Sequence, residues 1–155
     1  MFDCLIEFSK DYGYWGMAFI SFLAGTVVPI TSEVVLVFFL NLGLNPMLLT
    51  LSATAGNTLG GISCFLMGYL TNKERVQKFF KIPDRRMKRA DKMIQKYGYW
   101  TSSISFVPVM GEVLLVSLGV MRVNKYKVIL VMALGKLLRY LLITASYTGL
   151  VSYFG

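Results

Sequence analysis

The chain has 155 residues, of which 55% are hydrophobic, and its mean hydropathy is +0.60. This composition is too apolar for an ordinary soluble domain of this length and indicates a single membrane domain spanning residues 1–155. The net charge of +8 would suggest nucleic acid as a partner of a soluble chain, but ten of the sixteen Lys and Arg residues lie between Lys73 and Lys96. That concentration favours anionic lipid at a cytoplasmic surface.

The residue types that are rare or missing exclude further classes of function. The chain contains no histidine and two cysteines, Cys4 and Cys64. The usual neutral-pH general base and zinc ligand is therefore missing, and neither a disulfide framework nor a metal knuckle is supported. We expect no cofactor, no metal and no enzyme.

The N-terminal stretch 1–15 carries three acidic residues and no basic n-region, so it does not read as a signal peptide. A short amphipathic turn at the membrane interface and a frayed terminus are both compatible with it. Tyr12, Tyr14 and Trp15 then mark a boundary between water and lipid, where amphipathic aromatic residues concentrate.

Residues 22–37 place Pro29 and Glu33 inside an otherwise uncharged apolar run. As helices, the flanking segments 16–28 and 33–42 would measure roughly 20 Å and roughly 15 Å, less than the ~30 Å hydrocarbon core. We therefore predict a re-entrant hairpin with Pro29 at its tip and Thr31 or Ser32 capping the second half-helix. A single kinked span of the same residues is the alternative, and length does not exclude it.

A turn at residues 41–46 precedes a predicted membrane span at 47–70, which contains no charged residue. Small residues recur along this span at every fourth position, which predicts a close helix-packing seam: Ser52, Gly56, Gly60, Cys64 and Gly68. Asn57 lies one position beyond the seam. It is a polar group at depth, and we expect it to face a site.

The segment 71–96 is the basic part of the chain. Apolar residues recur in it at spacings of three and four among the Lys and Arg residues, on both sides of Pro83. We predict two amphipathic helices broken at Pro83 and lying on an anionic leaflet; a solvated charged loop is the alternative. The positive-inside rule places the segment in the cytoplasm, with the termini and the turn at 41–46 outside.

Residues 97–155 repeat the pattern of the first half. The sequence Tyr12-Gly13-Tyr14-Trp15 recurs at 97–100, and Ile20-Ser21-Phe22 recurs at 104–106. Pro108 and Glu112 follow Pro29 and Glu33 at an offset of 79 residues, and Gly111 corresponds to Ser32. A second crossing is predicted at 128–154.

If each repeat contains one hairpin and one crossing, the two repeats must be inverted in the membrane, as in alternating-access transporters. The predicted fold is thus an all-α membrane protein: an inverted repeat of a re-entrant helical hairpin plus a transmembrane helix. Repeat 1 spans about residues 12–70 and repeat 2 about 97–155, and the basic amphipathic segment 71–96 joins them.

Four charges fall inside the apolar segments: Glu33 and Glu112 in the hairpins, and Lys136 and Arg139 in the last helix. Each costs roughly 2.5–3.5 kcal/mol at the centre of a membrane helix, so we expect all four to face inward. They would form two buried ion pairs, or they would form a site. In such a site Lys136 and Arg139 would hold a phosphate and the glutamates would carry protons.

Four motifs in order resemble the DedA superfamily (VTT domain), and most closely its short YqaA-like branch. They are Pro29-Ile30-Thr31-Ser32-Glu33, the Gly- and Asn-rich stretch 53–61, the stretch 107–112, and Gly135-Lys136-Leu137-Leu138-Arg139-Tyr140. The resemblance implies paired re-entrant hairpins, a multi-pass protein of the bacterial inner membrane, and proton-dependent movement of phospholipids or undecaprenyl phosphate. It assigns the family's conserved acid to Glu33.

The chain departs from the family pattern at two places. Asn57 stands where many members have Asp, and Phe106, Val107, Val109 and Met110 stand where many have arginines that serve the substrate phosphate. Lys136 and Arg139 would then serve it from the last helix.

The sequence leaves three functions open: a lipid flippase or scramblase, a proton-coupled antiporter for small ions, and a membrane assembly or scaffold protein. The expected partners are anionic phospholipid or polyprenyl phosphate, with a homo-oligomer as a further possibility. The predicted site residues are Glu33, Glu112, Lys136, Arg139 and Asn57, with hairpin tips at Pro29, Thr31, Ser32, Pro108 and Gly111.

Overall fold

The computed structural model describes residues 2–26, 31–107 and 110–155, and all regular structure in these ranges is helical. The elements are α1 (Phe2–Ala24), α2 (Ser32–Asn41), α3 (Pro46–Leu70), α4 (Lys73–Phe80), α5 (Asp84–Tyr97), the 3₁₀ helix η1 (Gly98–Phe106), α6 (Met110–Val120) and α7 (Lys125–Phe154). The predicted hairpin tips Pro29 and Pro108 lie outside the described residues.

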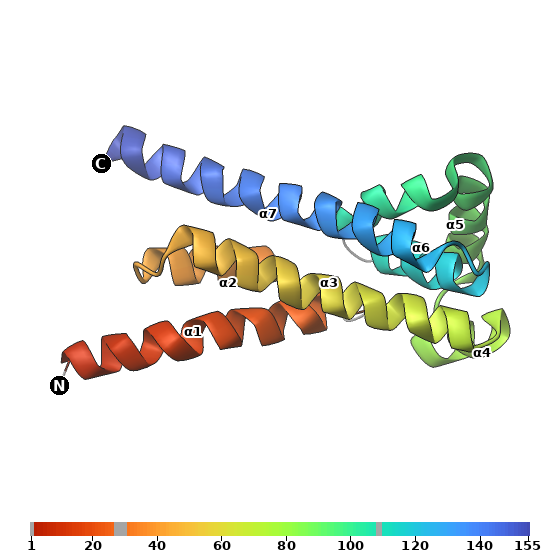
Figure 1. Cartoon of the computed structure of the whole chain (residues 1–155), viewed down its shortest axis with the longest axis horizontal. Helices are drawn as coiled ribbons and strands as arrows, with labels where there is room; N and C mark the ends of the chain where they lie inside the picture. The colour runs from red at the N-terminus through yellow and green to blue at the C-terminus, as the bar shows by residue number, and fades with distance from the viewer. Residues whose placement is uncertain (1, 27–30, 108–109) are drawn as a thin grey trace.

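The three long helices α1, α3 and α7 run along the length of the molecule (Figure 1). Helix α1 reaches the middle, and α2 returns to the end at which α1 began (Figure 1). The segment formed by η1 and α6 makes the corresponding excursion from the opposite end, where α4 and α5 lie (Figure 1). The chain path is compatible with two hairpins. Their entry into one face of a membrane stays a prediction.

Helix α1 differs from its predicted form. It runs for 23 residues from Phe2 to Ala24, whereas the sequence indicated a half-helix over 16–28 preceded by an interfacial turn or a frayed terminus. Its last turn tightens, since the Gly25 amide donates to the carbonyls of Ser21 and Phe22, and the Thr26 hydroxyl donates to Leu23. A helix of this length measures about 34 Å, so the short-segment argument for a hairpin does not apply to α1.

Helix α2 begins at Ser32, as predicted, but the capping prediction is wrong. Thr31 is the N-cap residue and its side chain makes no capping hydrogen bond. The Ser32 hydroxyl bonds to a side chain of α7 instead. The predicted turn follows at Leu42–Asn45, where Gly43 adopts a φ of 79°, and the Asn45 side chain caps α3 by accepting from the Met47 and Leu48 amides.

The small residues of α3 give the predicted close packing, but on two sides of the helix where the sequence indicated one face. A Cβ added to Gly56 would lie 2.0 Å from the carbonyl oxygen of Ala18 in α1. A Cβ added to Gly68 would lie 2.1 Å from the carbonyl oxygen of Val116 in α6. Backbone thus meets backbone on both sides, and α3 is the central helix of the fold.

The basic segment forms the predicted helix pair, α4 and α5, and the break falls at Pro83. Most of its apolar residues face the protein, since Val76, Met87, Ala90 and Ile94 pack with Phe65 and with α6 in the larger hydrophobic core, but Phe79 of α4 is 74% exposed. The outward face keeps most of the Lys and Arg residues exposed. The predicted contact with an anionic leaflet therefore rests on charge and on the exposed ring of Phe79.

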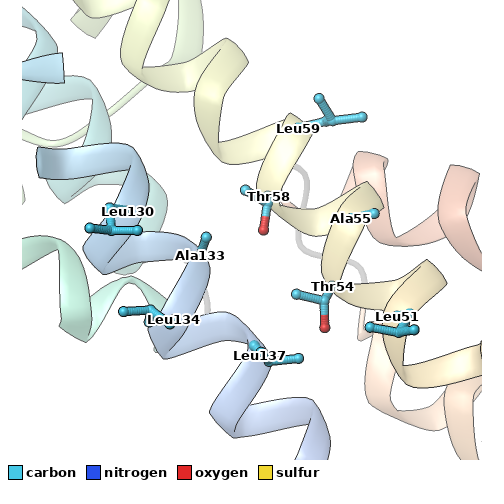
Figure 2. Close-up of a pocket in the computed structure, with 9 residues that line it drawn as sticks. All are labelled: Leu51, Thr54, Ala55, Thr58, Leu59, Leu130, Ala133, Leu134 and Leu137. Carbon is cyan, nitrogen blue, oxygen red and sulfur yellow. The ribbon is translucent and has the colours of Figure 1, made fainter. Parts of the chain in front are cut away.

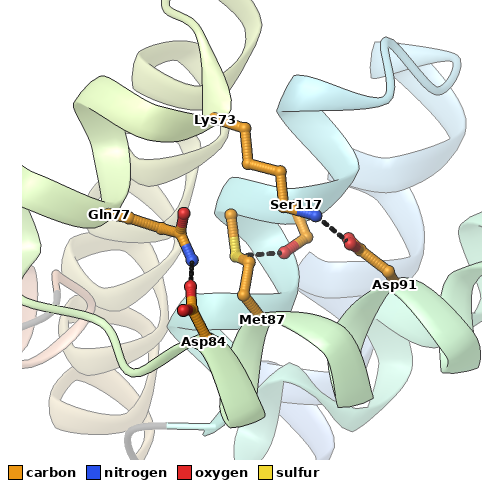
Figure 3. A network of polar contacts seen from close by, with 6 residues as sticks. All are labelled: Lys73, Gln77, Asp84, Met87, Asp91 and Ser117. Atoms are coloured by element: carbon orange, nitrogen blue, oxygen red, sulfur yellow. Dashed lines mark hydrogen bonds and ion pairs between the residues drawn. The ribbon is translucent and has the colours of Figure 1, made fainter.

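Two polar contacts join α4 to α5, and a third joins α5 to α6 (Figure 3). Lys73 of α4 pairs with Asp91 of α5, and the Gln77 amide donates to Asp84 over 2.8 Å. The Ser117 hydroxyl of α6 lies 3.1 Å from the sulfur of Met87.

The segment that opens repeat 2 is a 3₁₀ helix, η1, where a half-helix was expected to mirror the first hairpin. Hydroxyl groups explain the tighter winding, because Ser102 donates to the carbonyl of Tyr99 and Ser103 donates to that of Trp100, each three residues back. Such bonds offer the backbone an alternative to the α-helical ladder.

Helix α7 covers the predicted second crossing as one continuous helix, and its passage through a membrane stays a prediction. It runs for 30 residues, and the Asn124 side chain caps its start by accepting from the Tyr126 and Lys127 amides. By length and composition it is the one helix within residues 2–26, 31–107 and 110–155 that qualifies to cross a membrane. Helix α3 has the length, 25 residues, but is not apolar enough to qualify, so its crossing stays a prediction.

Candidate functional site

A stripe of buried residues follows one face of α7 and recurs at every fourth position: Val128, Met132, Lys136, Tyr140 and Thr144. Polar and charged groups occupy the three later positions of this stripe. The Thr144 hydroxyl bonds to that of Thr50 in α3, 2.7 Å away. The polar part of the stripe is therefore directed at the central helix.

Lys136 is 1% exposed, and its ammonium donates a hydrogen bond of 2.7 Å to the carbonyl oxygen of Asn57. The neighbouring glycine of α3 leaves room for it, because a Cβ added to Gly61 would lie 2.9 Å from Nζ. Glu112 of α6 is also buried, and its carboxylate acts electrostatically on Lys136. A buried ammonium thus has a hydrogen-bond acceptor and an opposite charge, as burial of a cation requires.

Tyr140 joins three helices through its hydroxyl. The side chain is fully buried, its oxygen accepts a 2.9 Å hydrogen bond from the Asn57 amide, and the same oxygen lies 2.6 Å from the hydroxyl of Ser32 in α2. Asn57 therefore bonds Lys136 through its backbone and Tyr140 through its side chain. Tyr140 was not predicted as a site residue, although its position four residues after Lys136 puts both on one face of α7.

Arg139 forms an ion pair with Glu33 at the start of α2. The two side chains remain 19% and 26% exposed, so this pair is more accessible than Lys136 and Glu112. Lys136 and Arg139, predicted to share one face, lie near different carboxylates: Lys136 is directed at α3 and α6, and Arg139 at α2. All four predicted charges take part in the cluster, which we call the polar cluster: Ser32, Glu33, Asn57, Glu112, Lys136, Arg139 and Tyr140.

The remaining predicted tip residues are Thr31, Gly111, Pro29 and Pro108. Thr31 is exposed beside the Glu33–Arg139 pair. Gly111 is buried, and a Cβ there would lie 2.3 Å from the carbonyl oxygen of Ser105, so only glycine permits this close approach. Pro29 and Pro108 lie outside the described residues.

Two serines at matching places in the repeats were not predicted as site residues. Ser21 and Ser105 are at most 1% exposed, and neither hydroxyl has a hydrogen-bond partner within the described ranges. Leaving a buried hydroxyl unbonded costs free energy. The recurring Ile-Ser-Phe triplet was the signal that could have identified them.

Comparison with known proteins gives the following matches. The model of the VTT domain family matches residues 28–148. The inner membrane protein YqaA of Escherichia coli K12 is 37% identical over 129 residues, which cover 81% of this chain and 84% of YqaA. Undecaprenyl phosphate transporter A of Staphylococcus aureus is 29% identical over 137 residues, covering 80% of this chain and 67% of the transporter.

An alkaline phosphatase-like protein of Lactococcus lactis is 26% identical over 153 residues, covering 89% of this chain and 71% of the relative. No solved structure matches.

Proposed function

The chain belongs to the VTT domain (DedA) family, in its YqaA-like branch, and from this premise we propose that it transports phosphate-bearing lipids across the membrane in a proton-dependent manner. The substrate would be a phospholipid or undecaprenyl phosphate, the lipid that the name of the Staphylococcus aureus relative specifies for that protein. Like its relative YqaA, it is a protein of the bacterial inner membrane.

The observation that carries the proposal is the polar cluster itself. Lys136 of α7 bonds to the middle of α3 beside Glu112 of α6 and is 1% exposed, and Arg139, three residues later on α7, pairs with Glu33 of α2. Ionisable groups inside membrane segments are expensive and mark ion, proton or substrate pathways. The planar guanidinium of Arg139 suits the oxygens of a phosphate, and Lys136 adds a point charge nearby.

The Glu33–Arg139 pair supplies the proton dependence. The ion pair of Glu33 with Arg139 supports this role, because such a pair needs an ionised carboxylate. When Glu33 takes up a proton, it loses the charge that holds Arg139, and the guanidinium can bind a phosphate. Release of the phosphate lets the carboxylate lose its proton and engage Arg139 again, so protonation and headgroup binding favour the same state.

The inverted-repeat architecture belongs to this proposal. The contact between Asn57 and Lys136 supports it, because these residues occupy corresponding positions 79 residues apart. Elements related by a two-fold axis can contact each other at corresponding positions only near that axis. Substrate sites of inverted-repeat transporters lie at this interface.

A proton-coupled antiporter for small ions is the second candidate. It is favoured by one observation, that Arg139 already has a carboxylate partner within the chain. The scaffold alternative loses its main support, because Gly56, Gly60 and Gly68 of the predicted seam pack against α1 and α6 of the same chain. Transport is favoured over catalysis, since the cluster's serine bonds to a tyrosine and not to a base that would activate it.

The test is reconstitution into liposomes that contain a fluorescent phosphate lipid in one leaflet, with a pH gradient across the membrane. We expect the protein to move the lipid and, while lipid is present, to dissipate the gradient. Collapse of the gradient at the same rate in liposomes made of lipids without a phosphate would favour the antiporter and end the lipid assignment. Arg139→Lys is the informative variant, since a single ammonium cannot grip two phosphate oxygens.

A further inference from the structure

A groove of about 510 Å³ lies between α3 and α7 (Figure 2). Five residues from the stretch 51–59 of α3 and four from the stretch 130–137 of α7 line it: Leu51, Thr54, Ala55, Thr58, Leu59, Leu130, Ala133, Leu134 and Leu137. The lining is almost entirely apolar. Leucines at its edges, such as Leu59 and Leu130, are more than half exposed, and the side chains of Thr54 and Thr58 lie on the side of α3 that faces α7 (Figure 2). In a membrane, such a surface lies in hydrocarbon and not in water.

The groove and the polar cluster occupy adjacent faces of the same two helices. Thr58 of the groove directly follows Asn57 of the cluster, and Ala133 and Leu137 of the groove flank Lys136. Successive residues of a helix are rotated by about 100°, so the apolar face and the charged face adjoin along both helices. An amphiphile in the groove would have its charged end within reach of a buried cation.

The hydroxyl of Thr58 distinguishes this groove from an ordinary crevice between two helices. Thr50 and Thr54, on the same helix, donate to the carbonyls four residues back, at 2.8 Å and 2.7 Å. The Thr58 hydroxyl is buried and has no hydrogen-bond partner within the described parts of the chain. A ligand oxygen between the groove and Lys136 would satisfy it.

We propose that this groove binds one hydrocarbon chain of a phosphate-bearing lipid, with the headgroup directed toward Thr58 and Lys136. The inference rests on the proposed function and adds where the lipid enters, namely sideways from the bilayer between α3 and α7. Charge complementarity favours this occupant over a second copy of the chain, because a helix in the groove would bring no anion to Lys136.

The test uses a phosphatidic acid with a diazirine in the middle of one acyl chain, at low mole fraction in vesicles that contain the protein and are otherwise made of lipids without a phosphate. A diacylglycerol with the same diazirine chain is the control probe. After illumination, adducts are mapped by mass spectrometry. We expect about threefold to tenfold more adducts on 51–59 and 130–137 than on other lipid-facing residues of α7, for the phosphate probe only.

Two variants of the protein sharpen the result. Ala133→Phe fills the groove and should reduce the adducts there to the level of the surrounding surface. Ala145→Phe adds the same bulk to an exposed position of α7 outside this groove and should leave them unchanged. Gel filtration of each variant checks folding and oligomeric state.

The labelling is repeated in Glu33→Gln, which separates this inference from the proposed function. If adducts form in the groove of both wild type and Glu33→Gln and neither protein transports lipid, the proposed lipid site stands. The same result would overturn the transport proposal. Transport by wild type with adducts spread evenly over the lipid-facing helices, or equal for both probes, would overturn the groove. Protein–protein crosslinks through 51–59 or 130–137 would overturn it in favour of a dimer interface.

Discussion

The second helices of the two hairpins, α2 and α6, occupy corresponding places in the sequence repeats but pack differently. Every residue of α6 from 111 to 119 is buried, whereas α2 buries only Ser32, Leu36 and Leu40. The difference follows from two corresponding pairs of residues. Gly119 meets Gly68 where α6 touches α3, and the positions 79 residues away hold Leu40 and Tyr147, which pack together in the smaller core.

Glycine at both positions lets two backbones touch, while leucine and tyrosine hold their helices apart. Between α2 and α7 the structure has a groove of about 450 Å³ that includes Val37 and Tyr147. The exposure of the two carboxylates reflects this difference in packing, since Glu112 is 5% exposed and the Glu33 side chain is 26% exposed. The same motif thus yields one enclosed acid and one accessible acid, and the accessible one is suited to exchange partners.

The largest expected effect on stability comes from Lys136→Met, which removes a cation beside the buried Glu112. We expect a loss of about 3–5 kcal/mol, because an uncompensated buried charge is left behind. Adding Glu112→Gln should recover most of it, while lipid transport should stay lost. In the accessible pair, Arg139→Met should cost only about 1 kcal/mol. Thermal unfolding in detergent measures these differences, and equal losses at the two pairs would refute the contrast.

Gly119→Ala tests the close contact of α6 with α3. The added Cβ would lie 2.1 Å from the carbonyl oxygen of Phe65, so the helices must move apart, at a cost of about 1–3 kcal/mol. Gly149→Ala in α7 is the control, because its Cβ would have no neighbouring atom within 4 Å and should be neutral or slightly stabilising. Similar melting temperatures for the two variants would show that the contact is not tight.

Tyr140→Phe removes the hydroxyl that connects repeat 1 to α7. The amide of Asn57 and the hydroxyl of Ser32 lose this partner inside the protein, and we expect a loss of about 1–2 kcal/mol. Tyr147→Phe is the matched change, since its hydroxyl bonds only to the exposed Asn41, and it should cost less than about 0.5 kcal/mol. The same unfolding assay compares them, and the reverse order would remove Tyr140 from the centre of the cluster.

The smallest effect on stability is expected for Glu33→Gln, less than about 1 kcal/mol, because the pair it breaks is partly exposed. Its functional effect is distinct. Binding of a phosphodiester lipid, whose own charge does not change near neutral pH, should strengthen in wild type as the pH falls and Glu33 becomes protonated, and it should not depend on pH in Glu33→Gln. Titration of the detergent-solubilised protein with the lipid at several pH values measures this, and a pH-dependent affinity in the variant would place the proton site elsewhere.

The elements that the sequence predicts well are those that local chemistry determines. Pro83 breaks the basic helix pair, Asn45 and Pro46 start α3, and the small residues of α3 mark its packing faces. The start of α1 was not predicted, because charged residues near the N-terminus were interpreted as an interface although they do not interrupt a helix.

The residues of the site were predicted better than their pairing. Depth and charge singled out Glu33, Glu112, Lys136 and Arg139. That Arg139 engages Glu33, and that Tyr140 connects Asn57 with Ser32, depends on how far α2 and α6 approach α3 and α7. That distance is decided by side chains such as Gly119 and Leu40, whose effect appears only when the helices are placed together.

The position of the chain ends gives a practical means of orienting the protein. Both ends and the turn after α2 lie at one end of the molecule, and α4 and α5 lie at the other (Figure 1). Single cysteines at exposed positions such as Leu42 and Tyr153 should therefore react together with a membrane-impermeant reagent, and one at Lys88 should react from the opposite side. Labelling at these three positions would therefore show which end of the molecule faces each side of the membrane.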